Sequence, residues 1–302
     1  MKFTVVFSQV LILFIILIIG FISRKFKILN VETNKSLTEF LVNVTIPFTI
    51  ISSFNQKYPH SAMLNAGKIF LLSFLIHGIS IIIGKIVTKN FKPTTKNVLW
   101  FVIIFSNCGF MGFPIMESIY GKIGIFYSSI YIIPFNLFLW TIGQIIFSET
   151  KDKKMMKKAI LNPGIIAVFL GLIIFIIPYD MPFVATNVFE LMGSLTSPLS
   201  MIIIGSMLAS INVKDIFSDI SVYYGSVIRL FLMPFIFLIL FKIIGISGIV
   251  LGVCIISTAM PAAANTVIFS EKFGGDSLLA SKIVFLSTAI SIITIPIYLI
   301  IL

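Results

Sequence analysis

Two apolar stretches of the sequence each place glycine or alanine, a proline and an amide side chain inside what would otherwise be a continuous membrane helix. The first reads SNCGFMGFP from Ser106 to Pro114, and the second reads TAMPAAANT from Thr258 to Thr266. Proline removes a backbone donor and glycine relaxes a helix, so free backbone groups are expected at both places. An anion could bind there against half-helix N-termini, with amide side chains as donors. The predicted substrate-binding residues are Asn107, Gly109, Gly112, Pro114, Pro261 and Asn265.

The depth of these residues supports this interpretation, although a purely structural one stays open. At about 1.5 Å per residue, Asn107 lies about 15 Å from a helix start near residue 97, close to the middle of a bilayer. Prolines within membranes also kink helices that bind nothing, and an asparagine can simply bond a neighbouring helix. Interrupted helices at corresponding places in two halves of a chain are nevertheless typical of a transporter site.

Three ionisable residues inside apolar segments are candidates for coupling or charge compensation. Glu117 lies one helical turn after Pro114 and is either a proton-coupling carboxylate or a hydrated group near the outer interface. Arg229 either neutralises substrate charge or extends to the cytoplasmic interface. His77 has no second metal-binding side chain at ligand spacing, so a hydrogen-bonded structural role is expected. We expect no metal site and no cofactor.

The composition determines the class of protein in which these residues act. The chain has 302 residues, of which 58% are hydrophobic and 11% charged, whereas soluble domains average about 45–50% and about 25%. It is therefore predicted to be an all-α polytopic membrane protein, with room for about ten spans and none for a soluble domain. The net charge of +11 is explained by membrane topology, so no nucleic-acid partner is expected, and the lipid bilayer is the surrounding partner.

Ten apolar segments are expected to form these spans, and the charges between them predict their orientation. The first segment is too long for the apolar region of a usual signal peptide and is expected to remain. Fifteen Lys and Arg residues lie in one alternate set of connections and five in the other, so both termini are predicted to face outward from the cytoplasmic membrane. The expected segments are 4–22, 37–56, 66–87, 97–118, 123–147, 162–178, 187–211, 222–244, 247–270 and 279–302.

A long polar connection near the middle of the chain leaves five segments on each side. Because five is odd, two related halves would insert in opposite orientations and form an inverted repeat. Weak internal similarity favours duplication, since Pro47 and Pro198 are 151 positions apart and Pro114 and Pro261 are 147 apart. The expected domains are a first five-helix repeat at 1–148, a cytoplasmic linker at 149–160 and a second repeat at 161–302.

The sequence resembles the auxin efflux carrier family over essentially its whole length. This family includes bacterial carriers for malate and malonate and the PIN-FORMED auxin exporters of plants. The ninth-segment motif is the most specific part of the resemblance. The residues that carry the resemblance are the Asn107 to Pro114 stretch with Tyr120-Gly121, the run Ala259-Met260-Pro261 with IFSEKFGGD from Ile268, the opening Gly20-Phe21 to Arg24-Lys25, and Asn162-Pro163.

The resemblance implies ten helices in two inverted repeats, similar to bile-acid transporters and sodium/proton antiporters. It implies that helices four and nine cross at Pro114 and Pro261, and that Asn107 matches the asparagine that binds the substrate's carboxylate. It also implies that helices 3–5 and 8–10 move against a scaffold of helices 1, 2, 6 and 7, which could form a homodimer. The plant exporters carry an Asp/Lys pair in helix three, where this sequence has only His77, so proton coupling through such a pair is not supported.

The function predicted from these features is secondary transport of a small organic anion, a carboxylate, by alternating access. A passive anion channel is the alternative, although it requires a continuous polar lining that the segments lack. An intramembrane enzyme requires paired catalytic groups, and the sequence has two histidines and no aspartate within the segments. A phosphate-binding loop for ATP hydrolysis is also absent from the sequence.

Overall fold

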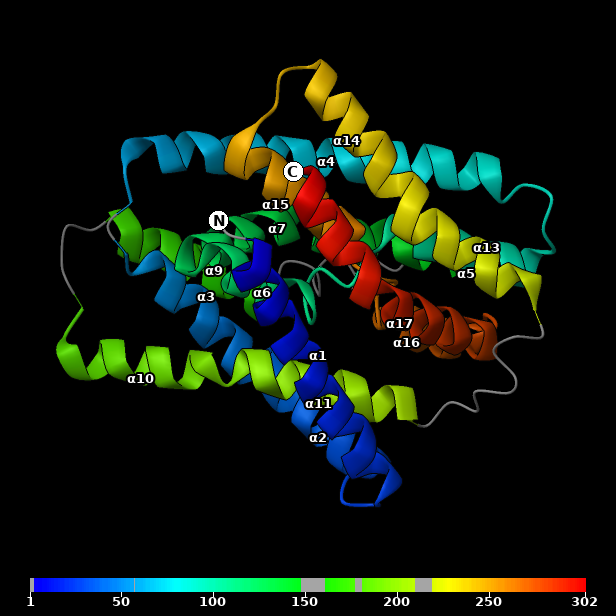
Figure 1. Cartoon of the computed structure of the whole chain (residues 1–302), viewed down its shortest axis with the longest axis horizontal. Coiled ribbons are helices and arrows are strands. Elements are labelled where there is room, and N and C mark those ends of the chain that lie inside the picture. The colour runs from blue at the N-terminus through cyan, green and yellow to red at the C-terminus, as the bar shows by residue number, and fades with distance from the viewer. Residues whose placement is uncertain (1–2, 57, 148–160, 177–180, 210–218) are drawn as a thin grey trace. The chain divides into compact units, whose positions relative to one another are not determined.

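The computed structural model describes residues 3–56, 58–147, 161–176, 181–209 and 219–302, and the regular elements of this part are helices (Figure 1). Six helical spans in this part are long and apolar enough to cross a membrane: Val31–Phe54, His60–Val87, Lys122–Phe147, Phe183–Ala209, Ile220–Ile243 and Ser277–Ile301. The prediction of an all-α polytopic membrane protein is therefore confirmed.

The described helices begin and end near the predicted segment boundaries, although several predicted segments divide in two. The expected linker at 149–160, with its basic residues, lies outside the described residues. The helices are α1 (Phe3–Lys25), α2 (Val31–Phe40), the π-helix η1 (Leu41–Thr45), α3 (Ile46–Phe54), α4 (His60–Val87), α5 (Pro93–Ile104), α6 (Gly112–Tyr120), α7 (Lys122–Phe147), α9 (Pro163–Ile176), α10 (Phe183–Ser194), α11 (Thr196–Ala209), α13 (Ile220–Val227), the π-helix η2 (Ile228–Leu232), α14 (Met233–Ile243), α15 (Gly248–Ala259), α16 (Asn265–Phe273) and α17 (Ser277–Ile301).

The chain divides into two compact units, and each unit draws on both halves of the sequence. The first unit comprises Met1–Gly67, Gly109–Ile130 and Ile160–Ser210, and the second comprises Lys68–Cys108, Tyr131–Ala159 and Ile211–Leu302. The chain passes from the second unit to the first between α5 and α6, at the predicted break in the fourth segment.

Within the first unit, α1 packs against α11 and α3 packs against α9 (Figure 1). Glycines allow these helices to approach closely. A side chain at Gly20 of α1 would overlap the main chain of Ile202, and a Cβ at Gly171 of α9 would lie 2.6 Å from the Phe54 ring. Small residues at such contacts are typical of membrane helices, which associate by close packing because lipid offers no hydrophobic driving force.

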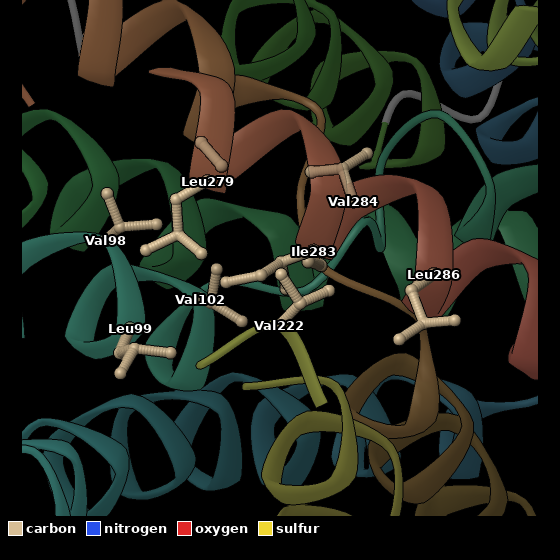
Figure 2. Packing of buried hydrophobic residues seen from close by; sticks show 10 residues of the cluster. Val98, Leu99, Val102, Val222, Leu279, Ile283, Val284 and Leu286 are labelled. Carbon is tan, nitrogen blue, oxygen red and sulfur yellow. The ribbon is translucent and has the colours of Figure 1, made fainter. Parts of the chain in front are cut away.

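Within the second unit, an apolar cluster holds α5 against α13 and α17. Figure 2 shows Val222 of α13 lying among the side chains of the other two helices. This packing fixes the position of α5, whose last residue leads directly into the break of the fourth segment. The labelled members of the cluster are Val98, Leu99, Val102, Val222, Leu279, Ile283, Val284 and Leu286.

Candidate functional site

Both predicted interrupted helices are interrupted in the structure. Residues 105–111 separate α5 from α6, and residues 260–264 separate α15 from α16. Pro261 lies within the second of these gaps, as predicted. Pro114 instead lies in the first turn of α6, where a helix needs no donor from its backbone nitrogen. The helix has already ended at Ile104, before the glycines and Pro114 of the predicted stretch.

The two unwound segments of the second unit pair with each other in an antiparallel fashion. Lipid offers no hydrogen-bond partners, so unwound backbone within a membrane must be paired inside the protein. This pairing satisfies four of the backbone groups that the breaks set free. It consists of an isolated bridge between Ser106 and Ala262, a hydrogen bond from Asn107 N to Pro261 O (2.7 Å) and a hydrogen bond from Ala263 N to Phe105 O (3.1 Å).

Two serine hydroxyls complete the pairing, and sequence reasoning identified neither. Ser106 Oγ donates to Ser257 O in the last turn of α15 at 2.8 Å. Ser287 Oγ of α17 accepts from Ala262 N at 3.1 Å. The sequence signal for Ser287 is a serine inside an apolar segment, and α17 contains other serines with the same signal.

The predicted amide of Asn107 is buried beside this pairing and remains unused. The residue is 4% exposed, and its side chain makes no hydrogen bond within the described part of the chain. Asn136 of α7, which sequence reasoning missed, is 8% exposed, and its side chain also makes no hydrogen bond within the described part of the chain. Because neither amide has a described hydrogen-bond partner, both are available to a polar ligand.

The remaining predicted binding residues divide between the two units. Asn265 is the first residue of α16 and is half-buried in the second unit. Gly109 is half-buried, and Gly112 and Pro114 are buried in the first turn of α6; all three belong to the first unit. The structure thus brings Asn107 and Pro261 into direct contact, and a binding role for the glycines, Pro114 and Asn265 stays a prediction.

Arg229 is buried in the second unit and does not extend to the membrane surface, so the interfacial alternative is wrong. The residue lies in η2 and is 1% exposed. Nη1 donates to Ile103 O at 2.8 Å, and Nη2 donates to Thr258 O. The guanidinium therefore joins the last turns of α5 and α15, just before both helices unwind. Helical periodicity alone could not have shown which way this side chain points.

Glu117 and His77 have hydrogen-bond partners within their own units. In the first unit, Glu117 is half-buried and accepts from Ser197 Oγ of α11 at 2.6 Å. In the second unit, His77 is 1% exposed and its Nδ1 lies 2.7 Å from Ser73 O. His77 thus makes a hydrogen bond, as expected, and its structural role and a coupling role for either residue stay predictions.

An aromatic enclosure surrounds the buried imidazole of His77. The ring of Phe138 is stacked on it at 10° with centroids 5.6 Å apart, and Phe105 of the unwound segment lies 6.3 Å away. Tyr131 and Phe135 of α7 lie 5.7 Å from it. These rings fill the space between α4, α7 and the end of α5 with rigid apolar surface.

Comparisons with known proteins place this geometry in context. The family model described as membrane transport protein matches residues 5–299. An uncharacterized transporter of Methanocaldococcus jannaschii is 24% identical over 299 residues, covering 96% of each chain. An uncharacterized transporter of Methanothermobacter thermautotrophicus is 22% identical over 297 residues, again covering 96% of each chain.

Proposed function

The chain belongs to the membrane transport protein family, the auxin efflux carriers, and from this premise we propose that it is a secondary carrier of a small organic anion. It is a transporter and not an enzyme. In this proposal a mono- or dicarboxylate crosses the cytoplasmic membrane by alternating access. The chain spans the membrane ten times as two inverted five-helix repeats, with both termini outside.

The packing of the first unit supports the inverted repeat. Gly20 of α1 and Gly171 of α9 are 151 positions apart, the same interval that separates Pro47 and Pro198. Each glycine sits where its helix packs closely against a helix from the other half of the chain, α11 for Gly20 and α3 for Gly171. Reciprocal contacts of this kind are expected when two copies of one unit pack about a twofold axis in the membrane plane.

The same interval of 151 positions relates two residues at the paired segments of the second unit. Ser106 and Ser257 are also 151 positions apart, and the hydroxyl of the first bonds the carbonyl of the second. Corresponding positions of two repeats would therefore meet at the point where both helices unwind. Transporter sites lie at such repeat interfaces, on discontinuous helices near the bilayer midplane.

The buried, unpartnered amide of Asn107 is the single observation that carries the proposed site. An amide nitrogen donates to a carboxylate without introducing a fixed charge into the membrane. A hydrogen bond from such an amide to a charged group contributes about 1.5–3 kcal/mol, which favours binding of an anion. The nearby guanidinium of Arg229, in the same unit, supplies a positive potential for an anion.

The division into two units supports a rigid-body mechanism. The first unit contains α1, α3, α9 and α11, which represent the expected scaffold helices 1, 2, 6 and 7. The second unit contains the paired segments and most of helices 3, 5, 8, 9 and 10. In this proposal the second unit carries the anion from one face to the other, while the first unit stays fixed and forms the contact of a homodimer.

Uptake of radiolabelled malate, malonate and monocarboxylates into proteoliposomes tests the proposal. Asn107→Ala should lower transport about tenfold or more, because a hydrogen bond to a charged group contributes about 1.5–3 kcal/mol. Asn43→Ala is the matched control, since Asn43 is exposed and bonds only its own helix. A folded Asn107→Ala variant that transports at the wild-type rate would remove the site. Ohmic current in a planar bilayer, in place of saturable countertransport, would favour the channel.

A further inference from the structure

We propose that the guanidinium of Arg229 takes the place of a coupling sodium ion at the ends of α5 and α15, so that this carrier works without Na⁺. The inference deepens the proposed function and rests on it for the transport step. Arg229 is assigned as a positioning residue. Its guanidinium contacts the half-helices that frame the site and has no described contact with the side-chain amide of Asn107.

The geometry of the two half-helix ends carries the first step. α5 ends at Ile104 and α15 ends at Ala259, so the carbonyls of Ile103 and Thr258 lie in their last turns. The last carbonyls of a helix lack intrahelical partners and carry partial negative charge. In carriers with discontinuous helices such carbonyls are the groups that coordinate Na⁺. Here Arg229 donates to one carbonyl from each half-helix.

The local backbone of the arginine supports a dedicated role. Arg229 lies in the π-helix η2, which interrupts the otherwise α-helical span from Ile220 to Ile243. A π-turn is rare, costs regular hydrogen bonding and is found frequently at functional sites. The forked guanidinium can reach two carbonyls of different helices at once, which the single ammonium of a lysine does with less fixed geometry.

The charge balance around the arginine carries the second step. No described carboxylate forms an ion pair with Arg229, and the described acidic residues of the second unit lie at helix ends, at Asp219, Glu271 and Asp276. The titratable side chains that act on the guanidinium are Tyr131, Cys108 and Tyr298, and His77 also feels its charge. The phenols and the thiol are uncharged at neutral pH.

Among the described residues, the cation is therefore balanced by helix dipoles and not by a carboxylate. A second cation at the same carbonyls would meet the fixed positive charge of Arg229 and find its ligands already engaged. The Nε atom of Arg229 is buried and has no partner within the described part of the chain. One donor and one net positive charge thus remain to favour an anion, and nothing in this arrangement favours Na⁺.

The test compares sodium with an organic cation at equal ionic strength. The melting temperature of the purified full chain is measured in NaCl and in N-methyl-D-glucamine chloride, with ²²Na⁺ binding by scintillation proximity and transport in both salts. We expect the wild type to show the same melting temperature and transport within twofold in both, and no saturable ²²Na⁺ binding. Sodium-dependent stabilisation, saturable ²²Na⁺ binding or transport that requires Na⁺ would overturn the inference.

The melting temperature of Arg229→Ala in different cations distinguishes a guanidinium that fills a cation site from one that only stabilises the fold. Arg229→Ala vacates both carbonyls, so added guanidinium or Na⁺ should raise its melting temperature by several degrees more than N-methyl-D-glucamine does. Lys282→Ala is the matched control, since Lys282 is 8% exposed in the same unit and has no described hydrogen bond; it should respond equally to all three cations. An Arg229→Ala variant that folds and responds to neither cation would contradict the inference.

The two proposals fail in different ways. If Arg229→Ala does not fold, the sodium measurements on the wild type decide the inference alone. If the wild type is indifferent to Na⁺ but transports no carboxylate, the proposed function falls and the replacement of Na⁺ by Arg229 stands. If Asn107→Ala loses transport and transport by the wild type requires Na⁺, the proposed carrier function is supported and the role of Arg229 is overturned.

Discussion

Replacing Ser287 by alanine isolates one hydrogen bond that holds the paired segments. Ser287 is fully buried, and its Oγ is the acceptor for Ala262 N at 3.1 Å. In Ser287→Ala the Ala262 N–H stays buried without a partner, which costs about 1–3 kcal/mol. With a central value of about 2 kcal/mol and about 1.6 °C of melting temperature per kcal/mol for a chain of 302 residues, we expect a loss of about 3 °C.

The matched control lies one turn further along the same helix. Ser291 is also fully buried, but its Oγ bonds only Thr288 O of its own helix at 2.6 Å. That carbonyl keeps its place in the helical ladder after Ser291→Ala, so the loss should be at most about 1 kcal/mol. Melting curves of the two purified variants in one detergent provide the comparison. Ser287→Ala at or above the melting temperature of Ser291→Ala would refute the reasoning.

Two predictions concern the first unit. Gly20→Ala should lower the melting temperature by the equivalent of about 1–3 kcal/mol, because its methyl group would overlap the main chain of Ile202; Gly67→Ala, which has nothing within 4 Å of its Cβ, should leave the curve unchanged or raise it. Thr49→Val should cost about 1–2 kcal/mol, since it removes the 2.6 Å contact with Thr196 Oγ1 at constant shape. Equal melting curves for Thr49→Val and the wild type would show that this hydroxyl contributes nothing.

Most of the helical architecture could be predicted from the sequence because lipid demands long apolar helices. The predicted segment at 123–147 matches α7 at Lys122–Phe147, for example. The two interrupted helices could also be predicted, since glycine and proline are conspicuous inside apolar runs. The position of the first break could be predicted only to within a few residues, because α5 ends at Ile104, before the stretch that holds the glycines and Pro114.

The contacts of the candidate site could not be predicted from the sequence in the same way. The antiparallel pairing between Ser106 and Ala262 uses backbone groups, which every residue has, so no side-chain pattern marks it. The direction of Arg229 depends on the neighbouring helices, and only their packing shows that it points to the carbonyls of Ile103 and Thr258. Asn107 could be identified because an amide deep in an apolar run is costly to bury and therefore rare without a function.

Both proposals depend on the pairing of the two unwound segments within the membrane. The bonds that flank Ser106 and Ala262 make them a non-hydrogen-bonded antiparallel pair, whose Cα atoms lie about 4.5 Å apart. This separation is within the range that a disulfide spans. The double variant Ser106→Cys/Ala262→Cys is therefore made in a chain whose two native cysteines are replaced by alanine.

The decisive measurement is the yield of the disulfide between positions 106 and 262 when native membranes are treated with an oxidant, followed by digestion and mass spectrometry. Thr49→Cys/Thr196→Cys is the reference pair, because their hydroxyl oxygens lie 2.6 Å apart in the buried part of the first unit. The pairing predicts that the two disulfides form in comparable yield and that reduction reverses both. Formation of the reference disulfide without any link between positions 106 and 262 would contradict it.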